Sequence, residues 1–152
     1  MDDDYRFMRA ALDEARLALR TGDVPVGAVA VYNGQIIGRG YNRREADHDP
    51  TAHAEIIALR EAGEALGHWR LDGVTLYCTL EPCCMCAGAM VQARLPRLVY
   101  AALDPWAGCA GSIVDVLRHP RFNHRVDVDI GPYGAEAAAL LNSFFDNLRR
   151  VD

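Results

Sequence analysis

The chain has 152 residues, of which 51% are hydrophobic and 24% are charged, and its net charge is −5. That length corresponds to a single domain, which we expect to span residues 1–152 and to bury one proper core. The composition excludes a disordered chain, and no apolar stretch approaches the roughly 18 residues that a membrane-spanning helix needs. The start of the chain, Met1–Asp4, is acidic and therefore unlike a signal peptide, so we expect a cytoplasmic protein.

Helix and strand signals alternate in the first half of the chain. The predicted segments are, in order, a helix over residues 5–19, strands over 24–32 and 35–41, a charged loop over 42–50 and a helix over about 52–66. Gly22 ends the first helix, and Asn33-Gly34 is a strong signal for a two-residue turn between the strands. Thr51 is the candidate cap of the later helix, which we expect to end near Gly67.

The second half continues this alternation. The predicted segments are a strand over 74–79, a helix with Pro82 in its first turn, a strand over 97–102, a short helix over 112–117, a strand over 126–130 and a helix over 133–150. The apolar side of the last helix is formed by Leu140, Leu141, Phe144, Phe145 and Leu148. Strands that alternate with helices predict a layered α/β domain in which the later strands are parallel.

Three residues in two of these segments are suited to bind a metal. Cys83 and Cys86 are three residues apart and share one helical face, and His53 can meet them if the two helix starts converge. One imidazole and two thiolates suit Zn²⁺, and three protein ligands leave the fourth tetrahedral position for water, as in catalytic sites. The pattern therefore favours a catalytic zinc over a structural zinc knuckle or a redox pair.

The other cysteines do not fit the spacing of a zinc ligand. The chain has five cysteines, an odd number, and three of them lie close together at Cys83, Cys84 and Cys86. In a cytosolic protein such a cluster indicates a metal site or catalysis rather than a disulfide framework. Cys84 does not share the helical face of Cys86, so we expect it to be a small buried hydrophobic residue. Cys78 lies in a predicted strand, and Cys109 lies in a glycine-flanked loop.

Glu55 lies two residues beyond His53. Its carboxylate could be a fourth ligand, or it could lie beside the water on the metal. Hydrolysis requires the second role, because one group must take a proton from the water and give it to the leaving group. We therefore expect Glu55 to act as the catalytic acid and base.

The sequence resembles the bacterial tRNA adenosine deaminases, which belong to the zinc-dependent cytidine/deoxycytidylate deaminase superfamily. The matching stretches include Asp23-Val24-Pro25-Val26-Gly27-Ala28, Gly40-Tyr41-Asn42-Arg43, His53-Ala54-Glu55, Thr79-Leu80-Glu81-Pro82-Cys83, Met85-Cys86-Ala87-Gly88-Ala89-Met90, Gly111-Ser112 and Asn123-His124-Arg125-Val126. The His-x-Glu and Pro-Cys-x-x-Cys motifs are shared with cytosine, cytidine and guanine deaminases. The runs at 87–90 and 123–126 resemble the tRNA branch in particular.

This resemblance implies a three-layer α/β/α cytidine-deaminase-like fold, with a five-stranded mixed sheet and helices on both faces. It implies hydrolytic deamination of adenosine to inosine at the wobble position of a tRNA anticodon loop, in a homodimer. The reaction would use a zinc-activated water, with one Zn²⁺ per subunit held by His53, Cys83 and Cys86, and Glu55 as proton shuttle. The implied substrate-binding residues are Asn42, Val24, Pro25, Leu80 and Asp104. Asn42 could instead be an ordinary turn residue, and Val24, Pro25 and Leu80 could simply be core.

The loop over 103–108 departs from the family pattern, in which basic residues are common around Asp104. Leu103 and Trp106 stand there instead, and Trp106 could either stack on a flanking nucleotide or pack against the body of the protein. Despite the acidic total we expect RNA binding by a positive face, unless its arginines are paired with nearby aspartates. The arginines concerned are Arg43, Arg44, Arg118, Arg121, Arg125, Arg149 and Arg150.

Two other functions remain open on the sequence alone. A guanine or cytosine deaminase would use the same chemistry on a free base or nucleoside. A non-catalytic, zinc-stabilised RNA-binding module would need the ligands but would leave Glu55 unexplained. Deamination of an anticodon stem-loop, compared with free bases, would discriminate among them.

Overall fold

The computed structural model describes residues 2–151, so Met1 and Asp152, and with them the first residue of the acidic start, lie outside the described part. Its elements are α1 (Asp2–Leu17), the 3-10 helix η1 (Ala18–Thr21), β1 (Gly27–Tyr32), β2 (Gln35–Tyr41), α2 (Arg44–Asp47), α3 (Ala54–Leu66), β3 (Val74–Leu80), α4 (Cys84–Gln92), β4 (Arg97–Ala102), β5 (Asp127–Ile130) and α5 (Gly134–Val151). None of the described helices combines the length and the apolarity that crossing a membrane requires.

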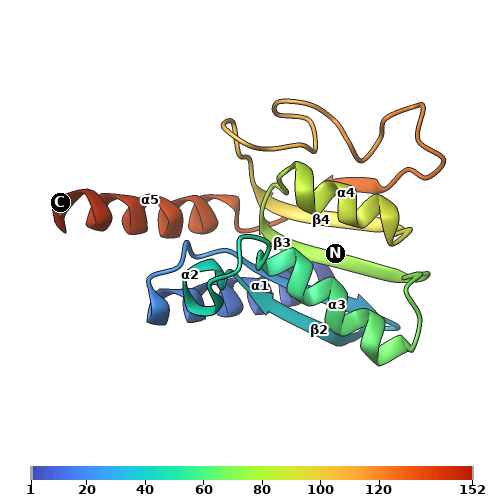
Figure 1. Cartoon of the computed structure of the whole chain (residues 1–152), viewed down its shortest axis with the longest axis horizontal. Helices are drawn as coiled ribbons and strands as arrows, with labels where there is room; N and C mark the ends of the chain where they lie inside the picture. Colours follow the sequence, from blue (N-terminus) through green and yellow to red (C-terminus); the bar gives the residue numbers. More distant parts are fainter. Residues whose placement is uncertain (1, 152) are drawn as a thin grey trace.

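The five strands form one mixed sheet in the order β2-β1-β3-β4-β5 (Figure 1). β1 pairs antiparallel with β2 and β3, whereas β4 is parallel to both β3 and β5. The first two strands are joined at Asn33 and Gly34, whose φ angles of 51° and 75° suit the tight turn predicted there. The predicted fold class and the parallel arrangement of the later strands are confirmed.

Helices cover both faces of the sheet, as the alternation of side chains along β1 requires. Ala28 and Ala30 point into the core shared with α3 and α4. Val29 and Val31 point the other way, into a second core that α1 and the start of α5 complete. Figure 1 shows α3 and α4 side by side over one face of the sheet, with α1 behind it. The first residues of α3 and α4 therefore lie over the same face.

Helix α3 lies unusually close to the sheet because β2 has glycines beneath it. A Cβ atom on Gly38 would lie 2.3 Å from the carbonyl oxygen of Ala58, and one on Gly40 would lie 2.2 Å from that of Ala54. Such distances are far inside van der Waals contact, so any side chain at these positions would push the helix away. The glycines thus fix the depth at which the start of α3 sits.

Some predictions about local structure are wrong, for identifiable reasons. The helix predicted over 112–117 is absent: Ala110 and Asp115 form an isolated β-bridge, and the Ser112 backbone and hydroxyl groups donate to Glu81. Thr51 does not cap α3, because its hydroxyl donates to Asp49. Pro82 precedes α4 instead of lying in its first turn. The loop predicted over 42–50 contains the short helix α2.

Among the described residues of α5, those of the first half pack more closely against the domain than those of the second half. Ala137 is buried on the sheet, whereas Phe145 and Leu148 are 40% and 52% exposed. Figure 1 shows the second half of the helix extending beyond the other elements. The predicted apolar side of this helix is therefore only partly covered.

Candidate active site

The three predicted metal ligands lie at the starts of two neighbouring helices. His53 is the residue that precedes α3, in extended conformation with ψ of 151°, and Cys83 precedes α4 in the same way. Cys86 follows in the first turn of α4 and is buried. Because both helices cover the same face of the sheet, their first turns converge and bring the three side chains together.

The geometry of the three ligand atoms fits a tetrahedral metal. Nδ1 of His53 lies 3.5 Å from Sγ of Cys83 and 3.5 Å from Sγ of Cys86, and all three atoms lie within 4.8 Å of one another. Zinc bonds of about 2.0 Å to nitrogen and 2.3 Å to sulfur place two tetrahedral ligands roughly 3.5 Å apart. His53, Cys83 and Cys86 can therefore hold such an ion together without rearrangement.

The charges of these groups also favour a cation. A hydrogen bond from the Cys86 thiol lowers the pKa of Cys83 to about 3, and the same bond raises the pKa of Cys86 above its usual value. A hydrogen bond to Cys83 raises the pKa of His53. These shifts favour a thiolate at Cys83, and a bound metal would displace the proton of the Cys86 thiol.

Glu55 lies beside this cluster in the first turn of α3 and is 4% exposed. Burial raises the pKa of its carboxyl above the ordinary value, and the negative charge of Cys83 acts in the same direction. Glu55 is not in the group of three converging ligand atoms. A carboxyl whose pKa is raised towards neutrality can both accept and return a proton.

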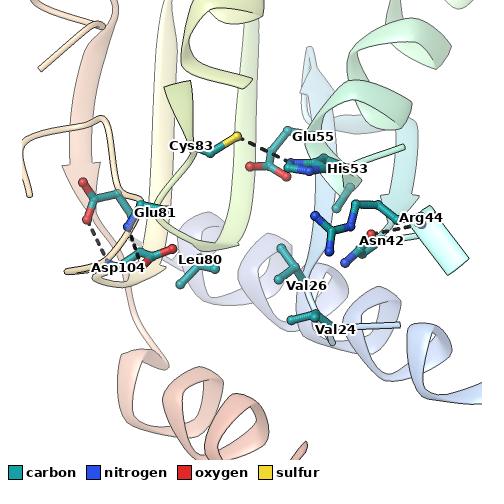
Figure 2. A pocket seen from close by; sticks show the side chains of 12 residues that line it. Val24, Val26, Asn42, Arg44, His53, Glu55, Leu80, Glu81, Cys83 and Asp104 are labelled. Carbon is teal, nitrogen blue, oxygen red and sulfur yellow. Dashed lines mark hydrogen bonds between the residues drawn. The ribbon is translucent and has the colours of Figure 1, made fainter. Parts of the chain in front are cut away.

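His53, Glu55 and Cys83 line a pocket of about 160 Å³ (Figure 2). Its lining residues are Val24, Val26, Asn42, Arg44, His53, Ala54, Glu55, Leu80, Glu81, Cys83, Asp104 and Ala107. Of the predicted substrate-binding residues, Pro25 is buried but does not line the pocket, and the others do. The volume is well below the roughly 300–1,000 Å³ of pockets for drug-sized ligands, so it suits a single base.

Asn42 makes the hydrogen bond of a turn residue and also lines the pocket, so the structure is compatible with both roles that the sequence left open. It is 8% exposed, and its Oδ1 accepts a hydrogen bond from the backbone N–H of Arg44 at 3.2 Å, as a turn asparagine does. Within the described residues its Nδ2 has no hydrogen-bond partner, so this amide remains free to donate into the pocket. The buried Asp23 holds the adjoining helix α2 by accepting from the N–H groups of Glu45 and Ala46.

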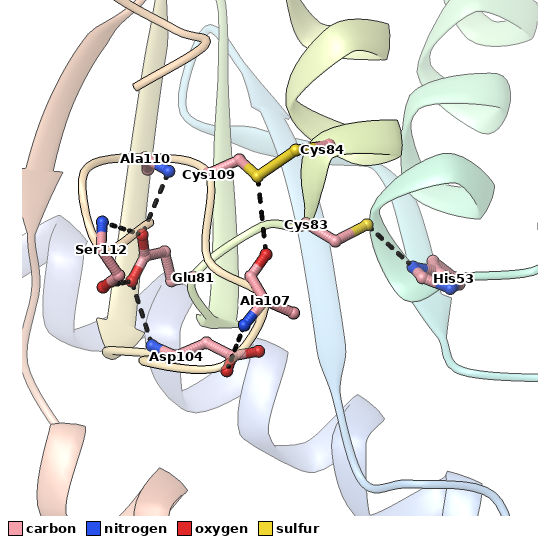
Figure 3. Close-up of a disulfide and its surroundings, with 9 residues drawn as sticks. All are labelled: His53, Glu81, Cys83, Cys84, Asp104, Ala107, Cys109, Ala110 and Ser112. Carbon is pink, nitrogen blue, oxygen red and sulfur yellow. Dashed lines mark hydrogen bonds between the residues drawn. A yellow bond between two sulfur atoms is a disulfide. The ribbon is translucent and has the colours of Figure 1, made fainter. Parts of the chain in front are cut away.

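Sequence reasoning missed the role of Glu81, which is buried directly before the Pro-Cys motif. Its carboxylate accepts hydrogen bonds from the N–H groups of Asp104, Ala110 and Ser112 and from the Ser112 hydroxyl (Figure 3). Burial alone would raise the pKa of Glu81, but these hydrogen bonds outweigh it and lower the pKa. Glu81 therefore anchors the loop that follows β4 against the edge of the pocket. The only signal in the sequence is an acidic residue placed between a buried strand and a proline.

Cys84 is not the small buried hydrophobic residue that we predicted. It is exposed and forms a disulfide with Cys109, with the two Cα atoms 5.2 Å apart. Figure 3 shows the Cys84 sulfur turned away from Cys83, whose own sulfur points to His53. The loop after β4 returns to α4, where the N–H of Cys109 donates to the carbonyl oxygen of Pro82, and this return makes the disulfide possible.

Trp106 does not pack against the body of the protein, which was one of its two predicted roles. Its side chain is 88% exposed. Three of the arginines expected to form a positive face are paired with aspartates: Arg43 with Asp47, Arg118 with Asp115, and Arg149 with Asp146. Among the described residues, Arg44, Arg121, Arg125 and Arg150 have no carboxylate within 4.0 Å.

Comparison with known proteins decides the family. The family model described as MafB19-like deaminase matches residues 1–149. The tRNA-specific adenosine deaminase of Bacillus subtilis (strain 168) is 47% identical over 150 residues, which cover 99% of this chain and 93% of that protein. The chain belongs to the tRNA-specific adenosine deaminase family.

Solved structures place this deaminase more finely. One, from a study of A-to-I editing by tRNA:A34 deaminases at the wobble position of transfer RNA, has a TM-score of 0.86 and 47% identity. The match covers 90% of this chain and 99% of that one. A guanine deaminase from Nitrosomonas europaea is also similar, with a TM-score of 0.74, 28% identity, and coverage of 91% and 82%. The deaminase thus shares its fold with enzymes for different bases and is more similar to the tRNA enzyme.

Proposed function

We propose that this protein hydrolyses adenosine to inosine at the wobble position of a tRNA anticodon loop. The observation that carries the proposal is a buried glutamate beside a His-Cys-Cys cluster, inside a pocket that suits a single base. The similarity to tRNA-specific adenosine deaminases supports tRNA as the substrate class. An anticodon loop presents bases that are already unstacked, so little energy is needed to bring one into the pocket.

The chemistry follows from the positions of the side chains. We propose one Zn²⁺ per subunit, held by His53, Cys83 and Cys86. When bound, zinc would supply a Lewis acid that lowers the pKa of a water molecule. Glu55 takes a proton from the water that adds to C6 of adenine and gives it to the neighbouring ring nitrogen. It then moves the second proton, from the hydroxyl group now on C6, to the amino group, and the C6–N bond breaks to release ammonia. The free Nδ2 amide of Asn42 donates to the base and orients it.

The deciding experiment is inosine detection after incubation with an anticodon stem-loop that carries adenosine at the wobble position. Parallel reactions contain free adenosine, adenine, guanine or cytosine. Inosine in the stem-loop alone supports the proposal. Rapid turnover of free guanine, with an unchanged stem-loop, would replace it with the alternative that the similarity to guanine deaminase favours.

The matched control is Glu55→Ala. We expect this variant to retain zinc and the fold, because Glu55 is not among the three ligands, and to lose turnover by at least the roughly 10²–10⁴-fold typical of general acid–base catalysis. Metal analysis and the inosine assay on the same preparation check both statements. A variant without zinc would make Glu55 a ligand. Unchanged turnover in the variant would mean that Glu55 is not the proton shuttle. A parent protein that also has no turnover would leave the non-catalytic RNA-binding module as the better explanation.

We also propose that two copies associate as a homodimer and act in the cytoplasm, as the resemblance implies. Light scattering on the purified protein should give about twice the subunit mass of 16.7 kDa. A mass of one subunit at working concentrations would remove the dimer from the proposal without affecting the chemistry.

A further inference from the structure

Trp106 is the most exposed large apolar residue described in the structure, and its backbone is firmly held. Oδ1 of Asp104 accepts hydrogen bonds from the N–H groups of Trp106 and Ala107, at 3.0 and 3.1 Å. The N–H of Gly108 donates to the Asp104 carbonyl oxygen at 2.9 Å. These bonds close a tight turn, and the next residue, Cys109, is fixed by its disulfide. The turn therefore presents the indole ring to solvent from a well-supported backbone.

This turn forms part of the pocket rim. Asp104 and Ala107 both line the pocket, and Trp106 lies between them in the chain. Consecutive Cα atoms are about 3.8 Å apart, so the backbone of Trp106 is at the rim itself. Leu103, on the other side of Asp104, is 59% exposed and extends the apolar surface of the rim.

The size of the pocket determines what must lie over this rim. A volume of about 160 Å³ suits one base, so the nucleotides on either side of the target must remain outside. Figure 2 shows Arg44 across the pocket from Asp104, and Arg44 has no carboxylate partner among the described residues. The cation on one side can bind a phosphate of a single strand, and the exposed indole on the other side can stack on the face of a base.

From this arrangement we propose that Trp106 stacks on the nucleotide adjacent to the target adenosine and is a substrate-binding residue for single-stranded RNA. The inference rests on the proposed function, because it requires an RNA substrate. Stacking needs only an aromatic face, so Trp106 contributes affinity for the flanking nucleotide and little preference for its identity.

The first test measures binding to an anticodon stem-loop in the Glu55→Ala background, so that no turnover intervenes. Trp106→Ala should weaken binding roughly 5- to 150-fold, the range for removing one aromatic stacking partner, and Trp106→Phe should retain most of the affinity. Trp69→Ala is the matched control, because Trp69 is 64% exposed and lines a different groove, beside Leu59 and Ala93. The control should bind as the parent does.

The second test identifies the nucleotide that is stacked. Stem-loops carry an abasic unit either 5′ or 3′ of the wobble adenosine, and each is combined with Trp106→Ala in a double-mutant cycle. At the stacked position the two decreases in affinity should not add, because the variant and the abasic unit remove the same interaction. Strict additivity at both positions would overturn the proposal.

Fluorescence and kinetics supply readouts that a merely structural role would not change. The chain has two tryptophans, so Trp69→Phe leaves Trp106 as the only one, and stem-loop binding should quench its emission. In the active enzyme Trp106→Ala should raise KM and leave kcat unchanged. Equal affinity of the parent and Trp106→Ala would overturn the inference but not the deaminase. A parent that binds no stem-loop would overturn both.

Discussion

Cys83, Cys84 and Cys86 lie within four residues, yet the structure gives them different roles. Cys83 and Cys86 face His53, whereas Cys84 begins α4 on the other side and is bonded to Cys109. The difference follows from helical geometry, since residues three apart share a face and residues two apart do not. Position relative to the helix start therefore separates the cysteines that face His53 from the one that forms the disulfide.

Metal analysis of cysteine variants checks this assignment. Cys83→Ser and Cys86→Ser should each reduce bound zinc from about one per subunit to near zero and lower the thermal stability, because the metal binds only the folded state. Cys84→Ser should retain nearly all the zinc, and Cys109→Ser is its matched control. Equal metal loss in all four variants would contradict the assignment.

The two roles of Asn42 can be separated by one atom. Asn42→Asp keeps an oxygen that can accept from the Arg44 N–H but lacks the Nδ2 donor, whereas Asn42→Ala lacks both. If the amide binds the base, both variants should reduce kcat/KM by about 5- to 10-fold or more, the cost of removing one hydrogen bond, with zinc retained. Normal kcat/KM in Asn42→Asp would show that Asn42 is only a turn residue.

The local part of the site could be predicted from the sequence, but the part made by the returning loop could not. His53, Cys83 and Cys86 could be recognised in the sequence because the type of a ligand side chain and its position in a helix depend only on neighbouring residues. Glu81 and the Cys84–Cys109 disulfide depend on contacts between residues more than twenty positions apart in the chain. Such contacts leave no periodic signal.

Helices and strands were predicted accurately where the repeat of apolar residues and the residues typical of turns indicate the same boundaries. The strands over 35–41 and 97–102 match β2 and β4 residue for residue. The helix predicted over 112–117 does not form, because the N–H and hydroxyl groups of Ser112 donate hydrogen bonds to the buried Glu81 carboxylate. Leaving a buried charge without hydrogen bonds costs more free energy than a short helix would gain. Tertiary hydrogen bonding thus overrode the local pattern.

The disulfide links the loop after β4 to α4 and so contributes to the free energy of unfolding of the domain. It joins residues 25 apart in the chain, a loop for which the chain-entropy model gives about 3.5 kcal/mol. The double variant Cys84→Ser/Cys109→Ser should therefore unfold at lower urea concentration, with a free energy of unfolding reduced by about that amount.

Reductant supplies the control for this prediction. Added dithiothreitol should lower the stability of the parent towards that of the double variant and leave the double variant unchanged. An equal decrease in both proteins would mean that reductant acts elsewhere. Because cytosolic thiols are kept reduced, the proposed location implies that this pair is at least partly open in the cell.

For the molecule as a whole, the net charge of −5 hides an uneven distribution. Arg43, Arg118 and Arg149 are paired with aspartates, so the alternative of a neutralised face holds for them. Arg121 and Arg125 lie in the long loop before β5 and have no carboxylate partner among the described residues. They are therefore the better candidates for binding phosphates.

A salt titration of stem-loop binding checks the role of these two arginines. The logarithm of the binding constant should fall with the logarithm of salt concentration by roughly 0.7 per neutralised phosphate. Arg121→Ala/Arg125→Ala should flatten the slope by about that amount for each phosphate that the variant no longer neutralises. Arg70→Ala is the control, because Arg70 is paired with Asp72 just beyond the far end of α3. A flat slope in the parent would argue against tRNA and for a free-base deaminase.

The strand order β2-β1-β3-β4-β5 has a consequence for how the chain folds while the ribosome makes it. After the first hairpin, each new strand pairs with one already in place, so the sheet can grow at one edge as the chain emerges. His53 is made 30 residues before Cys83, which at about 5–20 residues per second is a delay of roughly 1.5–6 s. During that interval the nascent chain holds only one of its three ligands. A metal held by all three proposed ligands could therefore bind only after β3 has been made.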